Sequence, residues 1–328
     1  MNKTNNHPKV SIVMGTYNGA QYLTEQIESI LNQTHHNLEV IIYDDGSKDQ
    51  TVKILEEYST KDSRLTFRKN PEQLGIITNF YTLIEATTGD YIAISDQDDR
   101  WELDKIERLV ANIGDHSLIY SDSNLIDQNG NSLKTTILKK LGHQPKEGSR
   151  ILTFFEKNTV SGHACLFHNS LKSHIKKNAE VRVGNDFMYD KMIATLASFN
   201  GGVAYYPTPL THHRIHTHNN HNKLLTDKKK LSPKNDSNVA VSFFAKKKQR
   251  LKNKIKAAKD KLIFYKDFLN ILLDDQEKPK TTNILQQYDK CLFNFGLYHT
   301  LTKKLNISRQ EAFKLSTGKY FIYLFRIF

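Results

Sequence analysis

Three carboxylates lie within four residues of one another at the end of an apolar run. The stretch YIAISDQDDRWELDK, residues 91–105, places Asp96, Asp98 and Asp99 directly after residues that read as a buried strand. Like charges at this spacing repel, which raises the free-energy cost of keeping all three ionised. A D-x-D pair such as Asp96 and Asp98 suits Mg²⁺ or Mn²⁺, which prefers one or two carboxylates together with substrate phosphate oxygens. Such a cation would remove the repulsion and neutralise a diphosphate.

The elements around this loop must bring its carboxylates to a common edge. Apolar, β-branched runs occupy 10–18, 38–47, 65–70 and 91–95, and helical patterns occupy 20–33, 50–59 and 79–87. Apolar strands that alternate with amphipathic helices are typical of a parallel sheet covered on both faces, and ligands bind such sheets at the carboxyl ends of the strands. Polar clusters at 16–19, 44–46 and 96–99 fall at such ends. We therefore predict an α/β fold in which they converge on one rim.

Charge and composition divide the chain into two regions. The net charge is +12, and residues 223–280 alone hold seventeen Lys and Arg against seven Asp and Glu. We predict a catalytic domain at 1–225 and a basic, mostly helical region at 226–328, with amphipathic helices at 243–273 and 281–304. No window approaches about 18 unbroken apolar residues, and the first apolar run is too short for a secretory signal. Two isolated cysteines suit a reducing compartment, so we expect a cytoplasmic protein.

Four stretches resemble the successive motifs of family 2 glycosyltransferases. They read SIVMGTYNGAQYLTEQIESILNQT, IIYDDGSKDQT, NPEQLGIITNF and ISDQDDRWELDKI, and the likeness runs in unbroken order over roughly residues 8–222. The S-D-Q-D-D-x-W form is similar to bacterial rhamnosyltransferases of cell-surface polysaccharide synthesis. The resemblance implies the GT-A fold, a nucleotide-sugar-binding α/β domain. It implies transfer of a sugar from a nucleotide-diphospho-sugar, such as dTDP-rhamnose or a UDP-sugar, to a surface-glycan hydroxyl.

The resemblance also implies which residues bind the donor and the cation, Mn²⁺ or Mg²⁺. The implied donor positions are Thr16, Tyr17 and Asn18 at the nucleotide pocket, Asp44 and Asp45 on the base or ribose, Gly75 where the backbone approaches the donor, Asp96 on the ribose or sugar side and Arg214 on the diphosphate. Asp98 would be the main metal ligand, and His216, in HRIHTHN, would complete the site.

One carboxylate is implied as the catalytic base. In VGNDFMYDKMI, Asp186 matches the base of the family, whereas Asn185 replaces the usual histidine. Asp186 would take a proton from an acceptor hydroxyl while that oxygen attacks the anomeric carbon opposite the leaving diphosphate. Displacement in one step inverts the anomeric configuration, and no second carboxylate is needed as a nucleophile.

Several single residues admit two interpretations. Asp190 is a reserve candidate for the base, although an exposed helical acid is the simpler reading. Asp99 is a third metal ligand or the N-cap of a helix at 102–110. Trp101 packs under the site rather than stacking on a sugar, and Asp122 contacts the acceptor or caps a turn. The histidines at 212, 213, 216, 218 and 221 fit no standard zinc spacing.

Other functions remain as alternatives. A nucleotidyltransferase would use the same D-x-D site, and a non-enzymatic nucleic-acid-binding protein would use the basic segment 223–280. A dehydrogenase is disfavoured because no G-x-G-x-x-G follows the first strand. We expect no nucleic-acid partner. The basic region would lie on an anionic membrane at the inner face of the cell membrane, or pack in a homo-oligomer.

Overall fold

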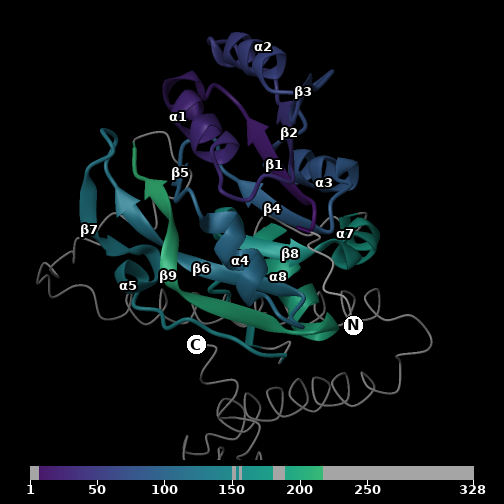
Figure 1. Ribbon diagram of the computed structural model, residues 1–328, viewed down its shortest axis with the longest axis vertical. Coiled ribbons are helices and arrows are strands. Elements are labelled where there is room, and N and C mark those ends of the chain that lie inside the picture. Colours follow the sequence, from purple (N-terminus) through teal and green to yellow (C-terminus); the bar gives the residue numbers. More distant parts are fainter. Residues whose placement is uncertain (1–6, 150–152, 155–156, 180–188, 217–328) are drawn as a thin grey trace, which may run out of the picture. The chain divides into compact units, whose positions relative to one another are not determined.

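The computed structural model describes residues 7–149, 153–154, 157–179 and 189–216, which form a mixed sheet with helices on both faces (Figure 1). The first half alternates strands and helices as the sequence predicts. Its elements are β1 (Val10–Thr16), α1 (Ala20–Leu31), β2 (Leu38–Asp44), α2 (Thr51–Lys61), β3 (Leu65–Lys69), α3 (Ile76–Ala86) and β4 (Tyr91–Ser95). Helix α3 starts earlier than its apolar pattern predicts, because Gly75 supplies its N-cap.

The second half is less regular. Its elements are β5 (Arg100–Trp101), α4 (Lys105–Asn112), β6 (Leu118–Ile126), β7 (Ser132–Thr136), α5 (Ile137–Leu141), the 3₁₀ turns η1 (Gly162–Ala164) and η2 (Asn169–Leu171), β8 (Cys165–His168), α7 (Lys172–Ala179), α8 (Tyr189–Asn200) and β9 (Val203–Arg214). Strand β9 therefore continues past the predicted strand at 201–210 and into the histidine-rich segment.

The strands follow the order β3-β2-β1-β4-β8-β6-β9-β5, with β7 beside β6. Strand β1 is parallel to β2 and to β4, with Thr16 opposite Asp44 and Met14 opposite Ser95. The carboxyl ends of these three strands therefore meet at one rim, which confirms the predicted convergence. Strand β9 runs parallel to β6 and pairs antiparallel with β5, so it brings residues 211–214 beside the loop that follows β4.

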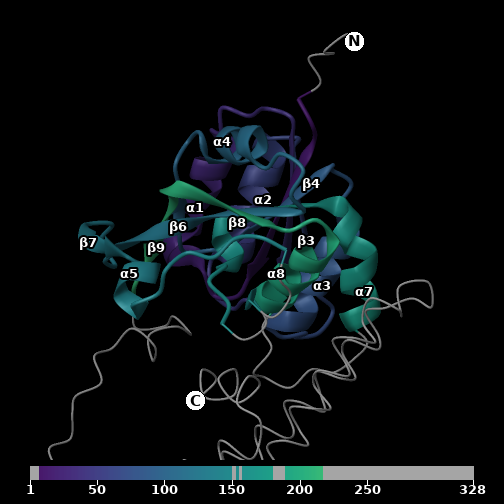
Figure 2. The same ribbon diagram turned by 90° about the horizontal axis from the view of Figure 1, so that it is seen from below.

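Two helical layers bury the sheet. Helices α1, α2 and α4 lie on one side, and α3, α7 and α8 lie on the other (Figure 2). Apolar residues of α1 and α4, such as Leu23, Ile27 and Leu109, join the β1 and β2 side chains in one buried cluster. This arrangement confirms the predicted α/β class. The predicted domain boundary at 225/226, the helices beyond it and Asp186 lie outside the described residues.

Among the residues that the structure describes, no helix combines the length and apolar character that crossing a bilayer requires.

Candidate functional site

The turn after β2 is built around the carboxylate of Asp44. Its Oδ1 accepts hydrogen bonds from the backbone N–H groups of Gly46 (3.1 Å) and Ser47 (2.9 Å), and its Oδ2 accepts from the Thr16 hydroxyl (3.1 Å). Asp44 is 0% exposed. The carboxylate thus shapes the turn after β2, and its predicted contact with a base or ribose stays a prediction.

Asp45 holds the loop that leads into α3. It accepts from the backbone N–H of Leu74 (2.7 Å) and Gly75 (2.8 Å) and from the side chain of Asn70 (3.0 Å). Gly75 has φ +76° and ψ 163°, a backbone conformation essentially reserved for glycine. Asp45 and Gly75 thus fix the shape of this loop, and their predicted contact with the donor stays a prediction.

The loop after β1 is tied to the acidic loop through Gln97, the middle residue of the D-x-D stretch. Its side chain accepts from Tyr17 N (2.9 Å) and donates to Tyr17 O (3.1 Å). A Cβ at Gly19 would lie 2.2 Å from Gln97 Oε1, so a side chain there would displace the Gln97 amide from Tyr17. Asn18 joins the β2 turn by accepting from Lys48 N (2.8 Å). Three of the predicted donor positions, 16–18, therefore share one rigid rim, with Tyr17 exposed.

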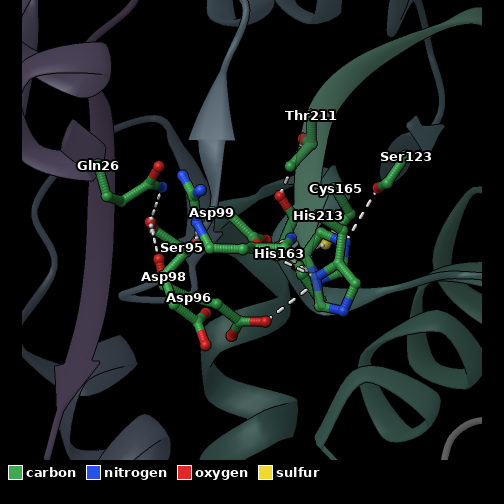
Figure 3. A network of polar contacts seen from close by, with 12 residues as sticks. Gln26, Ser95, Asp96, Asp98, Asp99, Ser123, His163, Cys165, Thr211 and His213 are labelled. Atoms are coloured by element: carbon green, nitrogen blue, oxygen red, sulfur yellow. Dashed lines mark hydrogen bonds and ion pairs between the residues drawn. The ribbon is translucent and has the colours of Figure 1, made fainter. Parts of the chain in front are cut away.

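Each carboxylate of the acidic loop contacts at least one histidine, which offsets the repulsion among the three like charges. The contacts are Asp96 Oδ2 to His163 Nδ1 (3.2 Å), Asp98 Oδ2 to His216 Nε2 (2.8 Å) and Asp99 Oδ1 to His213 Nδ1 (2.9 Å). Figure 3 shows Asp96 turned toward His163, with Ser123 on the other side of that ring. The rings of His163 and His213 stack at 4.7 Å. His163 carries no motif, so sequence reasoning missed it.

Burial and pairing move the pKa values of this loop in opposite directions. Burial raises the pKa of Asp98, although the His216 hydrogen bond opposes it. Burial alone would also raise the pKa of Asp99, yet attraction to His213 and His163 holds it below its ordinary value. Burial lowers the pKa of His213, but Asp99 outweighs this and raises it to about 9. Asp99 is therefore ionised beside a histidine that keeps its proton at neutral pH.

The chemistry of these side chains fits a divalent cation. One ligand atom from each of Asp96, Asp99, His163 and His213 lies within 4.8 Å of the other three. Asp99 Oδ2 is buried without a hydrogen-bond partner, and His163 Nδ1 lies 3.8 Å from it. Carboxylate oxygens suit Mg²⁺ and Mn²⁺, and His213 would release its proton on binding either ion. The predicted ligands Asp98 and His216 contact each other beside this group, and their metal role stays a prediction.

Asp99 is not a helix cap. Helix α4 begins at Lys105 with Asp104 at its N-cap, whereas Asp99 also accepts from Arg214 N (3.2 Å).

Trp101 is 2% exposed, which confirms that it packs under the site. Lys105 lies in the same interior: its Nζ is 3.4 Å from the Trp101 ring centroid and donates to His163 O (2.6 Å). Burial lowers the pKa of Lys105 to about 7.

Arg214 lies inside the protein rather than at the rim. Its Nε donates to Asp98 O (2.9 Å), its Nη2 pairs with Glu25 (2.5 Å), and its guanidinium lies over the Tyr22 ring at 4.6 Å. It is 1% exposed. Arg214 therefore fixes the backbone of the acidic loop, and its expected contact with a diphosphate stays a prediction.

The other histidines and Asp122 have local partners. His212 pairs with Glu102 (2.7 Å), while the histidines at 218 and 221 lie outside the described residues. Asp122 accepts from Ser123 N (2.8 Å) and from Leu138 N (3.2 Å), where α5 begins. Its contacts match the capping interpretation.

A cavity of about 170 Å³ opens beside Asp96. Its lining includes Asp190, which is partly buried rather than the exposed helical acid that the sequence favours. Burial raises the pKa of Asp190 to about 6. The remaining lining residues are Ile137, Leu138, Leu141, His143, Asn158, Thr159, Val160, Ser161, Gly162, His163, Tyr189 and His213.

Comparisons with known proteins agree on one family. A sequence model described as Glycosyl transferase family 2 matches residues 11–175, half of the chain. EpsH of Bacillus subtilis (strain 168), named as a glycosyltransferase, is 32% identical over 215 residues, 64% of this chain and 61% of EpsH. TuaG of the same strain, named for teichuronic acid biosynthesis, is 33% identical over 163 residues, 48% of this chain and 61% of TuaG.

The chain thus spans about three-fifths of the length of these curated relatives. Among solved structures, S. aureus TarS 1–349 is similar with a TM-score of 0.49 and 19% identity, over 63% of this chain and 60% of the TarS chain.

Proposed function

The chain belongs to glycosyl transferase family 2 and has its GT-A fold, and on that premise we propose that it transfers a sugar from a nucleotide-diphospho-sugar to a hydroxyl of a bacterial cell-surface glycan. The observation that carries the proposal is the histidine-paired acidic loop at the carboxyl ends of β1, β2 and β4, clamped to the Tyr17 backbone by Gln97. The likeness to TuaG, named for teichuronic acid biosynthesis, supports a polysaccharide acceptor. The donor is dTDP-rhamnose or a UDP-sugar.

Donor binding is assigned to the rim. Thr16, Tyr17 and Asn18 line the nucleotide pocket, and the loop that Asp45 and Gly75 hold closes its side. Asp98 and His216 hold Mn²⁺ or Mg²⁺, with the Asp96, Asp99, His163 and His213 group beside them as the alternative ligand set. When bound, the cation supplies positive charge that neutralises the departing diphosphate. Arg214 and Lys105 act from inside by fixing the backbone of Asp98 and of His163.

The reaction requires one base, and we propose Asp186 for that role, with inversion at the anomeric carbon. Asp190 is the second candidate, because it lines the cavity that also contains Asp96. Its pKa of about 6 lies close to neutral pH, where a base is both ionised and able to accept a proton.

We retain two proposals for residues 226–328. We propose that these residues are a region separate from the catalytic domain, which either attaches to an anionic membrane surface through its basic charge or packs in a homo-oligomer. Co-sedimentation with neutral and with anionic vesicles tests the first, because equal recovery with both would contradict an electrostatic attachment.

A donor panel tests the enzymatic proposal. The full chain is incubated with UDP-, dTDP- and GDP-sugars in Mn²⁺, Mg²⁺ or EDTA, and the released nucleotide products are separated. Metal-dependent release of a nucleoside diphosphate from one donor is expected. Release of pyrophosphate would instead indicate nucleotidyl transfer, and silence across all donors, with no nucleotide binding, would contradict the proposal.

A further inference from the structure

The cavity of about 170 Å³ beside Asp96 has two chemically different walls. One wall is polar. It contains Asp96, His163 and His213 from the candidate metal site, together with Asp190 from the first turn of α8. Branched aliphatic side chains from α5 and the segment before η1 supply the apolar part: Ile137, Leu138, Leu141 and Val160. A pocket with apolar walls and a few convergent polar groups is the usual form of a small-molecule site.

The apolar wall is held in place by the hydrogen bonds at both ends of α5. Thr136 caps its start by accepting from Lys139 N (3.3 Å), and Asp122 accepts from Leu138 N (3.2 Å). Gly142 ends the helix in the left-handed conformation. Leu138 is 5% exposed, whereas Leu141 on the same short helix is 37% exposed. A fixed helix thus presents an incompletely buried leucine to a cavity that adjoins the acidic loop.

The polar wall contains two carboxylates, Asp96, whose Oδ2 contacts His163, and Asp190. Asn158 is engaged with the Val160 backbone, donating to its carbonyl (2.7 Å) and accepting from its N–H (3.0 Å). His163 is engaged with Ser123 and Asp96. Asp190 Oδ1 accepts from Lys191 N (2.6 Å), and no hydrogen bond to its Oδ2 occurs among the described residues.

We propose that this cavity binds the acceptor as a single pyranose unit that carries a methyl group, in a 6-deoxy or an N-acetyl substituent. The methyl group packs against Leu141 and Ile137, and a hydroxyl of the ring donates to Asp190. Because a cavity of about 150 Å³ accommodates benzene, about 170 Å³ encloses the methyl-bearing part of one pyranose. This inference rests on the proposed function, because it takes the donor to lie on the other side of the acidic loop's carboxylates.

Paired glycosides test the inference on the full chain with Mn²⁺ and UDP or dTDP present. The probes are methyl glycosides of N-acetylglucosamine and glucose, and of L-rhamnose and L-mannose, which differ in the methyl-bearing substituent. Saturation-transfer NMR reports which probe protons contact the protein, and titration gives each affinity. We expect the strongest saturation on the methyl protons of the substituent and about fourfold tighter binding of the methylated member, the factor that burial of one methyl group corresponds to.

Two leucine variants locate the contact. Leu141→Ser should abolish the preference within each pair, whereas Leu133→Ser, at a similarly exposed leucine of β7 outside the cavity, should retain it. Asp190→Asn should weaken all four probes without changing the preference. Because the methyl contact is measured on the wild-type protein, the proposal stays testable even if a variant fails to fold.

Equal binding within each pair, or no binding of any probe, would overturn the inference. If the same protein still binds the nucleotide, the proposed function stands. A wild-type protein that binds neither UDP nor dTDP would overturn both. Retention of the preference in Leu141→Ser would place the methyl group elsewhere and contradict the assignment of the wall.

Discussion

His216 Nε2 lies 2.8 Å from Asp98 Oδ2, although 118 residues separate them in the chain. The contact exists because β9 runs beside β6 and pairs with β5, so its far end reaches the loop after β4. The same crossing brings His213 to Asp99. The acidic loop is therefore stabilised by histidines that arrive from the opposite end of the catalytic domain, and a change in either partner should affect the other.

Replacement of His216 tests whether it serves the cation. His216→Gln should reduce Mn²⁺ affinity or metal-stimulated donor turnover about 10–100-fold, the usual loss when a group that binds or orients at a metal is removed. The matched control is His212→Gln, because His212 pairs with the exposed Glu102 instead. Mn²⁺ titration of donor hydrolysis measures both. An unchanged Mn²⁺ dependence in His216→Gln would assign the cation to the His163 and His213 side of the loop.

Lys105 should make stability depend on pH. Its pKa is about 7 in the folded protein and 10.5 ordinarily, so the unfolded chain binds more protons between these values and the free energy of unfolding rises with pH there. Lys105→Met removes this contribution. The free energy of unfolding of the variant, relative to that of wild type, should be highest below pH 7. This difference should shrink as pH rises toward 9.5. Urea denaturation in EDTA at pH 6.5, 8 and 9.5 measures the difference, which a pH-independent offset would contradict.

Asp45 should contribute to the stability of the folded protein even when no donor is bound. Asp45→Ala leaves the part-buried N–H groups of Leu74 and Gly75 without their acceptor, and a loss of about 1 kcal/mol is expected, the lower end of the cost of an unsatisfied buried donor. Asp62→Ala serves as the control, since its partly exposed pair with Arg64 contributes about 0–1 kcal/mol. Denaturant titration of both variants gives the free energies of unfolding. Equal losses would show that Asp45 has no special part in the loop.

Gly75→Ala isolates the backbone requirement at the start of α3. A Cβ there meets nothing within 4 Å, so any loss arises from the φ of +76° and is expected to be about 1–3 kcal/mol. Gly114→Asn is the comparison, because its φ of +54° lies in the left-handed region that asparagine tolerates. Thermal denaturation distinguishes them. A Gly75→Ala protein as stable as Gly114→Asn would mean that this loop relaxes without cost.

The sequence predicts the first half of the fold well, because each strand and helix there carries its own periodic pattern. It also places the polar clusters at 16–19, 44–46 and 96–99 on one rim, since parallel strands align their carboxyl ends. Partners across the sheet are a different matter. The burial of Arg214, the contact of His163 with Asp96 and the partly buried position of Asp190 depend on how β8, β9 and α8 dock, and no local pattern encodes that.

The role of Asp44 shows a second limit. A carboxylate at the end of a strand reads as a ligand-binding group, yet here it closes its own turn through Gly46 and Ser47. Both uses place an aspartate at the end of a strand and the start of a turn, so the sequence alone does not separate them.

The most direct test of the central claim is calorimetry of UDP and dTDP binding with and without Mn²⁺, comparing wild type, Asp98→Asn and the control Asp104→Asn, whose carboxylate pairs with Arg108 on α4. The account predicts Mn²⁺-dependent binding of one nucleotide by wild type and Asp104→Asn, and loss of that dependence in Asp98→Asn. Nucleotide binding that is equally strong in EDTA, or unchanged Mn²⁺ dependence in Asp98→Asn, would contradict a cation held by Asp98 at the acidic loop.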